Sequence, residues 1–154
     1  MRIPPSLKHG SVIAQLSALS HSQAVVQARL AAGRGAVAGA LAAARSFVVR
    51  AGLGRDPAER LAIIVEEWVA NVLEHGVPPA DSRISLRLAC DGGSVRITMT
   101  DAGQAFDPRA VAFEGPNLER GGGAGLELMR AWSRVIAYGR HGGRNRLVLE
   151  MPVG

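Results

Sequence analysis

The sequence has no long apolar run and only one cysteine. Its longest stretch without a polar side chain, residues 35–44, is about half of the ~20 residues that cross a bilayer, which excludes a transmembrane helix. Residues 12–19 are fairly apolar, but Gln15 and Ser17 interrupt them and no small-residue cleavage site follows, which disfavours a signal peptide. The single Cys90 excludes an internal disulfide. We therefore expect a cytoplasmic protein without a membrane partner.

Acidic residues are missing from the first third of the chain. No Asp or Glu precedes Asp56, whereas seven Lys or Arg residues do, so the first 55 residues carry a charge of +7. The other 99 residues carry 11 basic and 13 acidic side chains, a net charge near −2, which excludes a nucleic-acid binder that is basic throughout. No direct contact with nucleic acid is expected, because genome composition explains the excess of 17 arginines over one lysine equally well.

The 154 residues, 47% of them hydrophobic, are typical of a single globular domain. Residues 1–23 mix Pro, Gly, Ser and His without periodicity, which predicts a partly disordered N-terminal extension. Residues 24–154 then form the domain. It begins with a β-compatible segment at 24–31 and an Ala-rich helix that runs from the glycines at 33–35 to about residue 51.

A second helix is predicted over residues 57–75. Asp56 is the expected N-cap and Glu59 completes a capping box. Within this helix, Glu67 and Asn71 lie one turn apart, beside an apolar stripe. The stripe comprises Leu61, Ile64, Val65, Trp68, Val69 and Val72.

The C-terminal half alternates apolar and polar residues in three places. Residues 84–90 and 95–99 predict a hairpin whose second strand ends at Asp101. A helix over 125–136, with Ile136 on its inward side, precedes a last strand at 147–151. The order β-α-α-β-β-loop-α-β predicts an α+β two-layer sandwich, a mixed and mostly antiparallel sheet with helices on one face. Trp68, Phe47, Met99, Met129 and Met151 are predicted core residues, and Cys90 a structural one.

Glu67 and Asn71 form the first candidate functional element. A carboxylate beside an amide oxygen suits a site where one group takes a proton and the other binds hydrated Mg²⁺. A solvated helix face is the alternative interpretation.

Asp101 and Gly103 form the second element, at the end of a predicted strand. A buried carboxylate there can accept a proton from the exocyclic amino group of a purine, and a glycine lets the backbone approach the base. A simple turn is the alternative.

The third element is the glycine-rich segment at 120–125, which leads directly into a helix. Glycines before a helix N-terminus expose backbone amides and a positive dipole end to an anion. A flexible loop is the alternative, since the segment lacks the Lys-Ser/Thr of a Walker loop and no strand immediately precedes it.

Taken in their order along the chain, these three candidate elements resemble the motifs of a known protein superfamily. EEWVANVLEHG (66–76), TDAGQAFDP (100–108), LERGGGAGLELM (118–129) and GRNRLVLEM (143–151) resemble the GHKL ATPase superfamily. Within that superfamily the small anti-sigma-factor serine/threonine kinases look most similar, and the resemblance covers about residues 25–152.

The resemblance implies a role for each matching residue. Glu67 matches the catalytic base, Asn71 the ligand of Mg²⁺, and Asp101 the carboxylate that reads the adenine of ATP. Residues 107–122 match the ATP lid. The remaining implied nucleotide-binding residues are His75, Gly103, Ala105, Arg120, Gly121, Gly122, Gly123, Ala124, Gly125 and Leu126, of which Ala105 replaces a glycine that is usual in the family.

The function implied is transfer of the ATP γ-phosphate to a Ser or Thr of a small antagonist protein, with sequestration of a regulatory partner such as a sigma factor. A homodimer is also expected. One alternative is a catalytically silent ATP-binding module that only sequesters its partner. A detached histidine-kinase domain is disfavoured, because neither His9 nor His21 lies in a suitable phosphoacceptor helix. The basic first third, with Arg29, Arg34, Arg45 and Arg50, would then meet an acidic protein surface.

Overall fold

The computed structural model describes residues 23–110 and 124–154. The elements follow the order β1 (Val25–Ala31), α2 (Ala36–Ala51), α3 (Arg55–Asn71), η1 (Val72–Gly76), β2 (Arg83–Asp91), β3 (Ser94–Asp101), α4 (Ala124–Trp132), β4 (Arg134–His141) and β5 (Arg144–Pro152). Residues 1–22, nearly all of the predicted extension, lie outside the described ranges.

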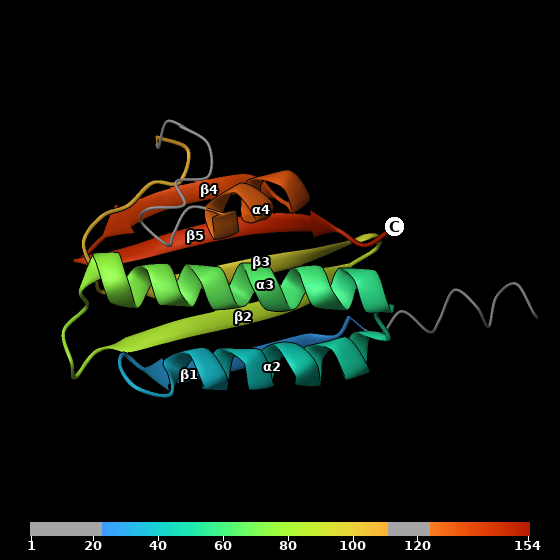
Figure 1. Cartoon of the computed structure of the whole chain (residues 1–154), viewed down its shortest axis with the longest axis horizontal. Helices are drawn as coiled ribbons and strands as arrows, with labels where there is room; N and C mark the ends of the chain where they lie inside the picture. Colours follow the sequence, from blue (N-terminus) through green and yellow to red (C-terminus); the bar gives the residue numbers. More distant parts are fainter. Residues whose placement is uncertain (1–22, 111–123) are drawn as a thin grey trace, which may run out of the picture.

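The strands form one sheet in the order β1-β2-β3-β5-β4. All the pairings are antiparallel, and no parallel pair occurs among the described strands. Figure 1 shows α2, α3 and α4 as a single layer in front of the sheet. The predicted α+β class, a sheet with helices on one face, is confirmed. None of the helices in the described ranges combines the length and the apolar character that crossing a membrane requires.

The core lies between the sheet and the helices. Leu88, Ile97 and Leu149 are paired across β2, β3 and β5, and all three are fully buried. Burying a side chain of this size contributes about 1.5–3 kcal/mol. Phe47, Trp68, Met99, Met129 and Met151 are buried as predicted. On α2, the buried alanines at 36, 40 and 44 recur at a spacing of four, so the helix presents one small-residue face to the core.

The start of α3 differs from the prediction. The helix begins at Arg55, and its N-cap is Gly54, which makes no side-chain capping bond. Asp56 lies inside the first turn, and Glu59 accepts a hydrogen bond from Nε of Arg55 at 2.9 Å. The predicted capping box is therefore wrong, because the helix begins before Asp56 and leaves it inside the first turn, where it caps nothing.

The strand β4 was not predicted. The helix α4 ends at Trp132, so Ile136 lies in β4, where it is 41% exposed rather than inward on a helix. The strand is at the edge of the sheet, and a register shift between Val135 and Ala137 interrupts its alternation. An irregular edge strand carries no clean two-residue period, which is why the pattern gave no signal.

Candidate functional site

The helix α3 carries the first pair of predicted site residues. Glu67 is exposed and Asn71 is half-buried, whereas Trp68 and Val69 between them are buried in the core. Within the described residues, neither polar side chain makes a hydrogen bond or an ion pair. The carboxylate and the amide are therefore available to an outside ligand.

Gly125, in the first turn of α4, lies directly against Glu67. The side chain of Glu67 occupies the place that a Cβ at residue 125 would take, with Oε2, Cδ and Cγ as its nearest atoms. Only a glycine at 125 leaves room for this arrangement. The positive end of the α4 dipole favours a carboxylate at that position. Of its neighbours, Ala124 is exposed and Leu126 packs partly buried against the core.

The end of the α3 region approaches the loop after β3. The π-helical turn η1 ends at Gly76, whose carbonyl accepts a hydrogen bond from Gln104 N at 2.8 Å. A Cβ on Gly103 would lie only 2.9 Å from the same carbonyl oxygen, so a glycine is required there. His75 and Ala105 are both exposed.

Asp101 ends β3 on the buried face of the sheet, with 4% of its surface exposed. Its Oδ1 accepts hydrogen bonds from Gly103 N and from Asn145 Nδ2, both at 2.9 Å. Within the described residues, Oδ2 accepts none. One carboxylate oxygen is thus held in place while the other keeps its acceptor capacity.

Asn145 of β5 is the centre of a polar network that joins the hairpin to this loop. Its Nδ2 donates to the carbonyl of Gly103 at 3.1 Å, in addition to Asp101. Its Oδ1 accepts from Tyr138 Oη at 3.1 Å and from Arg140 Nη1 at 2.8 Å. Arg140 also donates to the carbonyl of Gly103 at 2.7 Å.

The residues Asn145, Tyr138 and Arg140 were missed by the sequence reasoning. A signal was present for Asn145, because it lies two residues before Leu147 on the inward face of β5, where the pattern calls for an apolar side chain. Tyr138 and Arg140 lie on the irregular edge strand and had no such signal.

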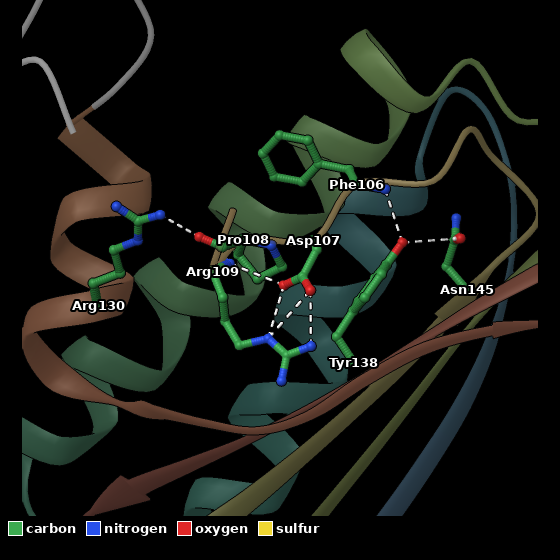
Figure 2. A network of polar contacts seen from close by, with 7 residues as sticks. All are labelled: Phe106, Asp107, Pro108, Arg109, Arg130, Tyr138 and Asn145. Atoms are coloured by element: carbon green, nitrogen blue, oxygen red, sulfur yellow. Dashed lines mark hydrogen bonds and ion pairs between the residues drawn. The ribbon is translucent and has the colours of Figure 1, made fainter. Parts of the chain in front are cut away.

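The loop from Phe106 to Arg109 is held from both sides. Phe106 N donates to Tyr138 Oη at 2.8 Å, and the Phe106 ring lies 5.8 Å from the ring of Trp68. The hydrogen-bonded Arg109 guanidinium lowers the pKa of Asp107. Figure 2 shows this loop between Tyr138 and α4, where Arg130 donates to the carbonyl of Pro108.

The glycine-rich element cannot be placed. Arg120, Gly121, Gly122 and Gly123, with most of the predicted lid at 107–122, lie outside the described residues. What the structure does bring together is Glu67 with Gly125, and Asp101 with Gly103 and Gly76.

A family model described as the histidine kinase-like ATPase domain matches residues 30–151, most of the chain. The chain belongs to this family. It is therefore an ATP-binding domain of the kinase and ATPase class. No curated protein sequence matches the chain.

Two solved structures share the fold of this ATPase domain. The RsbU and RsbW domains of Rv1364c from Mycobacterium tuberculosis match with a TM-score of 0.57 and 20% identity, over 84% of this chain and 32% of that one. The blue-light activated histidine kinase EL346 of Erythrobacter litoralis matches with a TM-score of 0.51 and 20% identity, over 68% and 33%. The chain thus spans about a third of the length of each.

Proposed function

We propose that this protein is an ATP-dependent serine/threonine kinase of the anti-sigma-factor type. It would transfer the γ-phosphoryl group of ATP to a Ser or Thr of a small antagonist protein, and it would sequester a regulatory partner such as a sigma factor. The observation that carries the proposal is the pair Glu67 and Asn71, one turn apart on α3, with the carboxylate seated at the start of α4.

The adenine end of the nucleotide fits the surroundings of Asp101. Oδ1 is held by Gly103 N and Asn145 Nδ2, which leaves Oδ2 to accept from an exocyclic amino group. Gly103 keeps side-chain atoms away from the place where a base would approach. With position six of the purine against Oδ2, adenine donates its amino group, whereas guanine would place a carbonyl oxygen against the carboxylate oxygen.

The phosphate end fits the residues around Glu67 and Asn71. Mg²⁺ prefers oxygen ligands and keeps several waters, so the half-buried Asn71 amide oxygen would bind it together with phosphate oxygens. Glu67 lies nine residues before Gly76, roughly 13 Å along a helix that rises ~1.5 Å per residue. The two ends are therefore separated by a length of the order of an extended nucleoside triphosphate.

The chain's own contribution to transfer is positioning and proton removal. Bound Mg-ATP supplies the phosphoryl group. The substrate hydroxyl oxygen forms a bond to the γ-phosphorus, the bond to the β–γ bridging oxygen breaks, and ADP leaves. Glu67 takes the hydroxyl proton, and the absence of a side chain at Gly125 leaves room for its carboxylate at the start of α4.

Nucleotide binding is tested first by thermal unfolding with ATP, ADP and GTP, with and without Mg²⁺. A ligand at 100 times its dissociation constant adds about 2.7 kcal/mol of stability, which is several degrees for a domain of this size. We expect an adenine-selective, Mg²⁺-dependent shift that Asn71→Ala loses. An equal shift with GTP would overturn the assignment of Asp101.

Transfer is tested by mass-spectrometric detection of phosphate on a cognate antagonist. Glu67→Gln should abolish transfer, because the amide cannot take the proton. Glu66→Gln is the matched control, since Glu66 is the exposed neighbour on the same helix. If Glu67→Gln leaves partner capture intact and wild type transfers no phosphate, the silent ATP-binding module is the correct alternative.

A further inference from the structure

The face of the sheet turned away from the helices is rich in arginine. Alternate residues of each strand point to this face, and the register places them in rows across the strands. One row runs Arg29, Ser85, Thr100, Arg146 and Gly139. Arg83 and Arg144 lie in the neighbouring row that is nearer the β4–β5 turn. Arg87 lies in the neighbouring row on the opposite side of the first one. We call the exposed residues Arg29, Arg83, Arg87, Arg144 and Arg146 the basic sheet face.

The basic sheet face lacks acidic partners. Among the described residues, no carboxylate lies within ion-pair distance of any of its five arginines. The two other arginines on this side of the sheet, Arg96 and Arg134, both pair with Glu150, at 3.8 and 3.0 Å. The unpaired positive charge is therefore concentrated at one end of the face.

Acidic residues gather on the opposite layer. The segment formed by α3 and η1 carries Asp56, Glu59, Glu66, Glu67 and Glu74. Only Asp91 and Glu150 occupy outward positions of the sheet. The same layer also carries Arg45, Arg50, Arg55, Arg60 and Arg130, so its charges nearly balance, whereas the outward face of the sheet keeps a net positive charge.

A hollow of about 460 Å³ lies at the charged end of this face. On the edge strand the small residue Gly139 pairs with Arg146, and Ala137 pairs with Val148, whereas Arg144 pairs with His141 in the next row. Space is open where a side chain at Gly139 would lie. Thr100 and His141 also line the hollow, together with Tyr138, Arg140 and Asn145 of the polar network around Asp101. None of the described lining residues is acidic.

The chemistry of this face selects among possible occupants. A second copy of the chain, packed face to face, would offer these arginines only Asp91 and Glu150 of the described strands, and Glu150 is already paired with Arg96 and Arg134. Single-stranded nucleic acid is bound by aromatic platforms on which bases stack. Tyr138 is the aromatic residue among the described lining residues of the hollow, and its hydroxyl is bonded to Phe106 N and Asn145 Oδ1 in the network around Asp101. Arginine forks bind carboxylates with two parallel hydrogen bonds, and the hollow admits side chains.

We propose that the basic sheet face is a docking surface for an acidic segment of a partner protein, whose carboxylates bind the five arginines and enter the hollow beside Gly139. The five arginines lie on the face opposite the helices and are not part of the proposed nucleotide site, although Tyr138, Arg140 and Asn145 border both. The proposal is therefore independent of the kinase function.

Fluorescence anisotropy with a labelled glutamate-rich peptide tests this surface in the full-length protein. Arg87→Glu/Arg146→Glu should weaken binding at least about tenfold. The matched control is Arg45→Glu/Arg50→Glu, which makes the same change of net charge at exposed positions of α2 and should leave binding within about twofold of wild type. Raising the salt concentration should weaken wild-type binding. If the glutamate pair does not fold, Arg87→Ser/Arg146→Ser provides the same test.

Three results would overturn the proposal. If both double variants weaken peptide binding equally, the peptide is held by general charge attraction and not by the basic sheet face. Tighter binding of a labelled oligodeoxythymidine than of the peptide, lost in Arg87→Glu/Arg146→Glu, would assign the face to nucleic acid. A dimer seen by sedimentation that this variant dissociates would assign it to a second copy.

Discussion

At the scale of single residues, Asn145 links the strand β5 to the carboxylate that the ATP-site proposal depends on. Its Nδ2 donates to Asp101 Oδ1 and to the carbonyls of Gly103 and Gln104. Both Asn145 and Asp101 are 4% exposed, so water cannot replace a lost partner without rearrangement of the site.

We expect Asn145→Ala to destabilise the protein by about 1–3 kcal/mol, because it leaves buried acceptors unsatisfied. The free energy of unfolding from urea titration measures this. Asn71→Ala is the matched control, since its amide makes no hydrogen bond to a described residue and alanine favours the helix; its cost should be below about 0.5 kcal/mol. Equal costs for the two variants would show that the Asn145 network adds no stability.

Gly125 is the second residue whose identity has a local physical reason. A methyl group at this position would displace the Glu67 side chain, but Glu67 is exposed and can rotate into solvent. We therefore expect Gly125→Ala to keep the folded stability, because alanine is favoured over glycine within a helix, and to lower phosphoryl transfer at least about tenfold. Unfolding and transfer measured on one preparation separate the two effects. Unchanged transfer would mean that the position of Glu67 beside Gly125 is not needed.

At the scale of elements, the π turn η1 is followed by a residue with a strained backbone. Val77 has φ of 45° and ψ of 58°, a left-handed conformation, and is 68% exposed. A left-handed β-branched residue costs about 1–2 kcal/mol. The strain occurs where the chain leaves Gly76, whose carbonyl holds Gln104 beside Asp101, so the turn positions the candidate adenine site.

Replacement of Val77 by glycine should raise the free energy of unfolding by up to about 1 kcal/mol, since the relieved strain exceeds the added flexibility of the unfolded chain. The same substitution at Val49, 81% exposed in α2, should lower it by about 0.5–1 kcal/mol. Opposite signs in thermal unfolding would support the strain. A loss of stability at both positions would mean that Val77 is not strained in solution.

At the scale of the whole molecule, the described residues build one hydrophobic core. The buried hydrophobic residues run from Ala24 to Met151, and the family match covers residues 30–151. Deletion of residues 1–22 should therefore change the melting temperature by less than about 2 °C and leave the ATP-induced shift intact. A larger loss would mean that the extension packs against the domain. Sedimentation of both chains would also test the predicted homodimer.

The sequence by itself determined the strands β2, β3 and β5, the helices α2 and α3, and the family of the domain. Periods of two and 3.6 residues report a buried face locally, and the motifs that resemble the GHKL superfamily lie within short segments. Glu67 and Asn71 could be placed on one helix face because four residues make about one turn.

Only the tertiary structure decided how distant segments meet. Asn145 and Asp101 are 44 residues apart, and the sheet register brings them together. The position of Gly125 against Glu67 depends on how α4 packs on α3, which no local spacing encodes. The capping box failed because the helix begins at Arg55, which places Asp56 inside its first turn. The strand β4 was missed because an irregular edge strand has no clear period. The basic sheet face also depends on the strand register, which brings arginines of different strands into neighbouring rows. The spacing of these arginines along the sequence does not reveal which of them share a face.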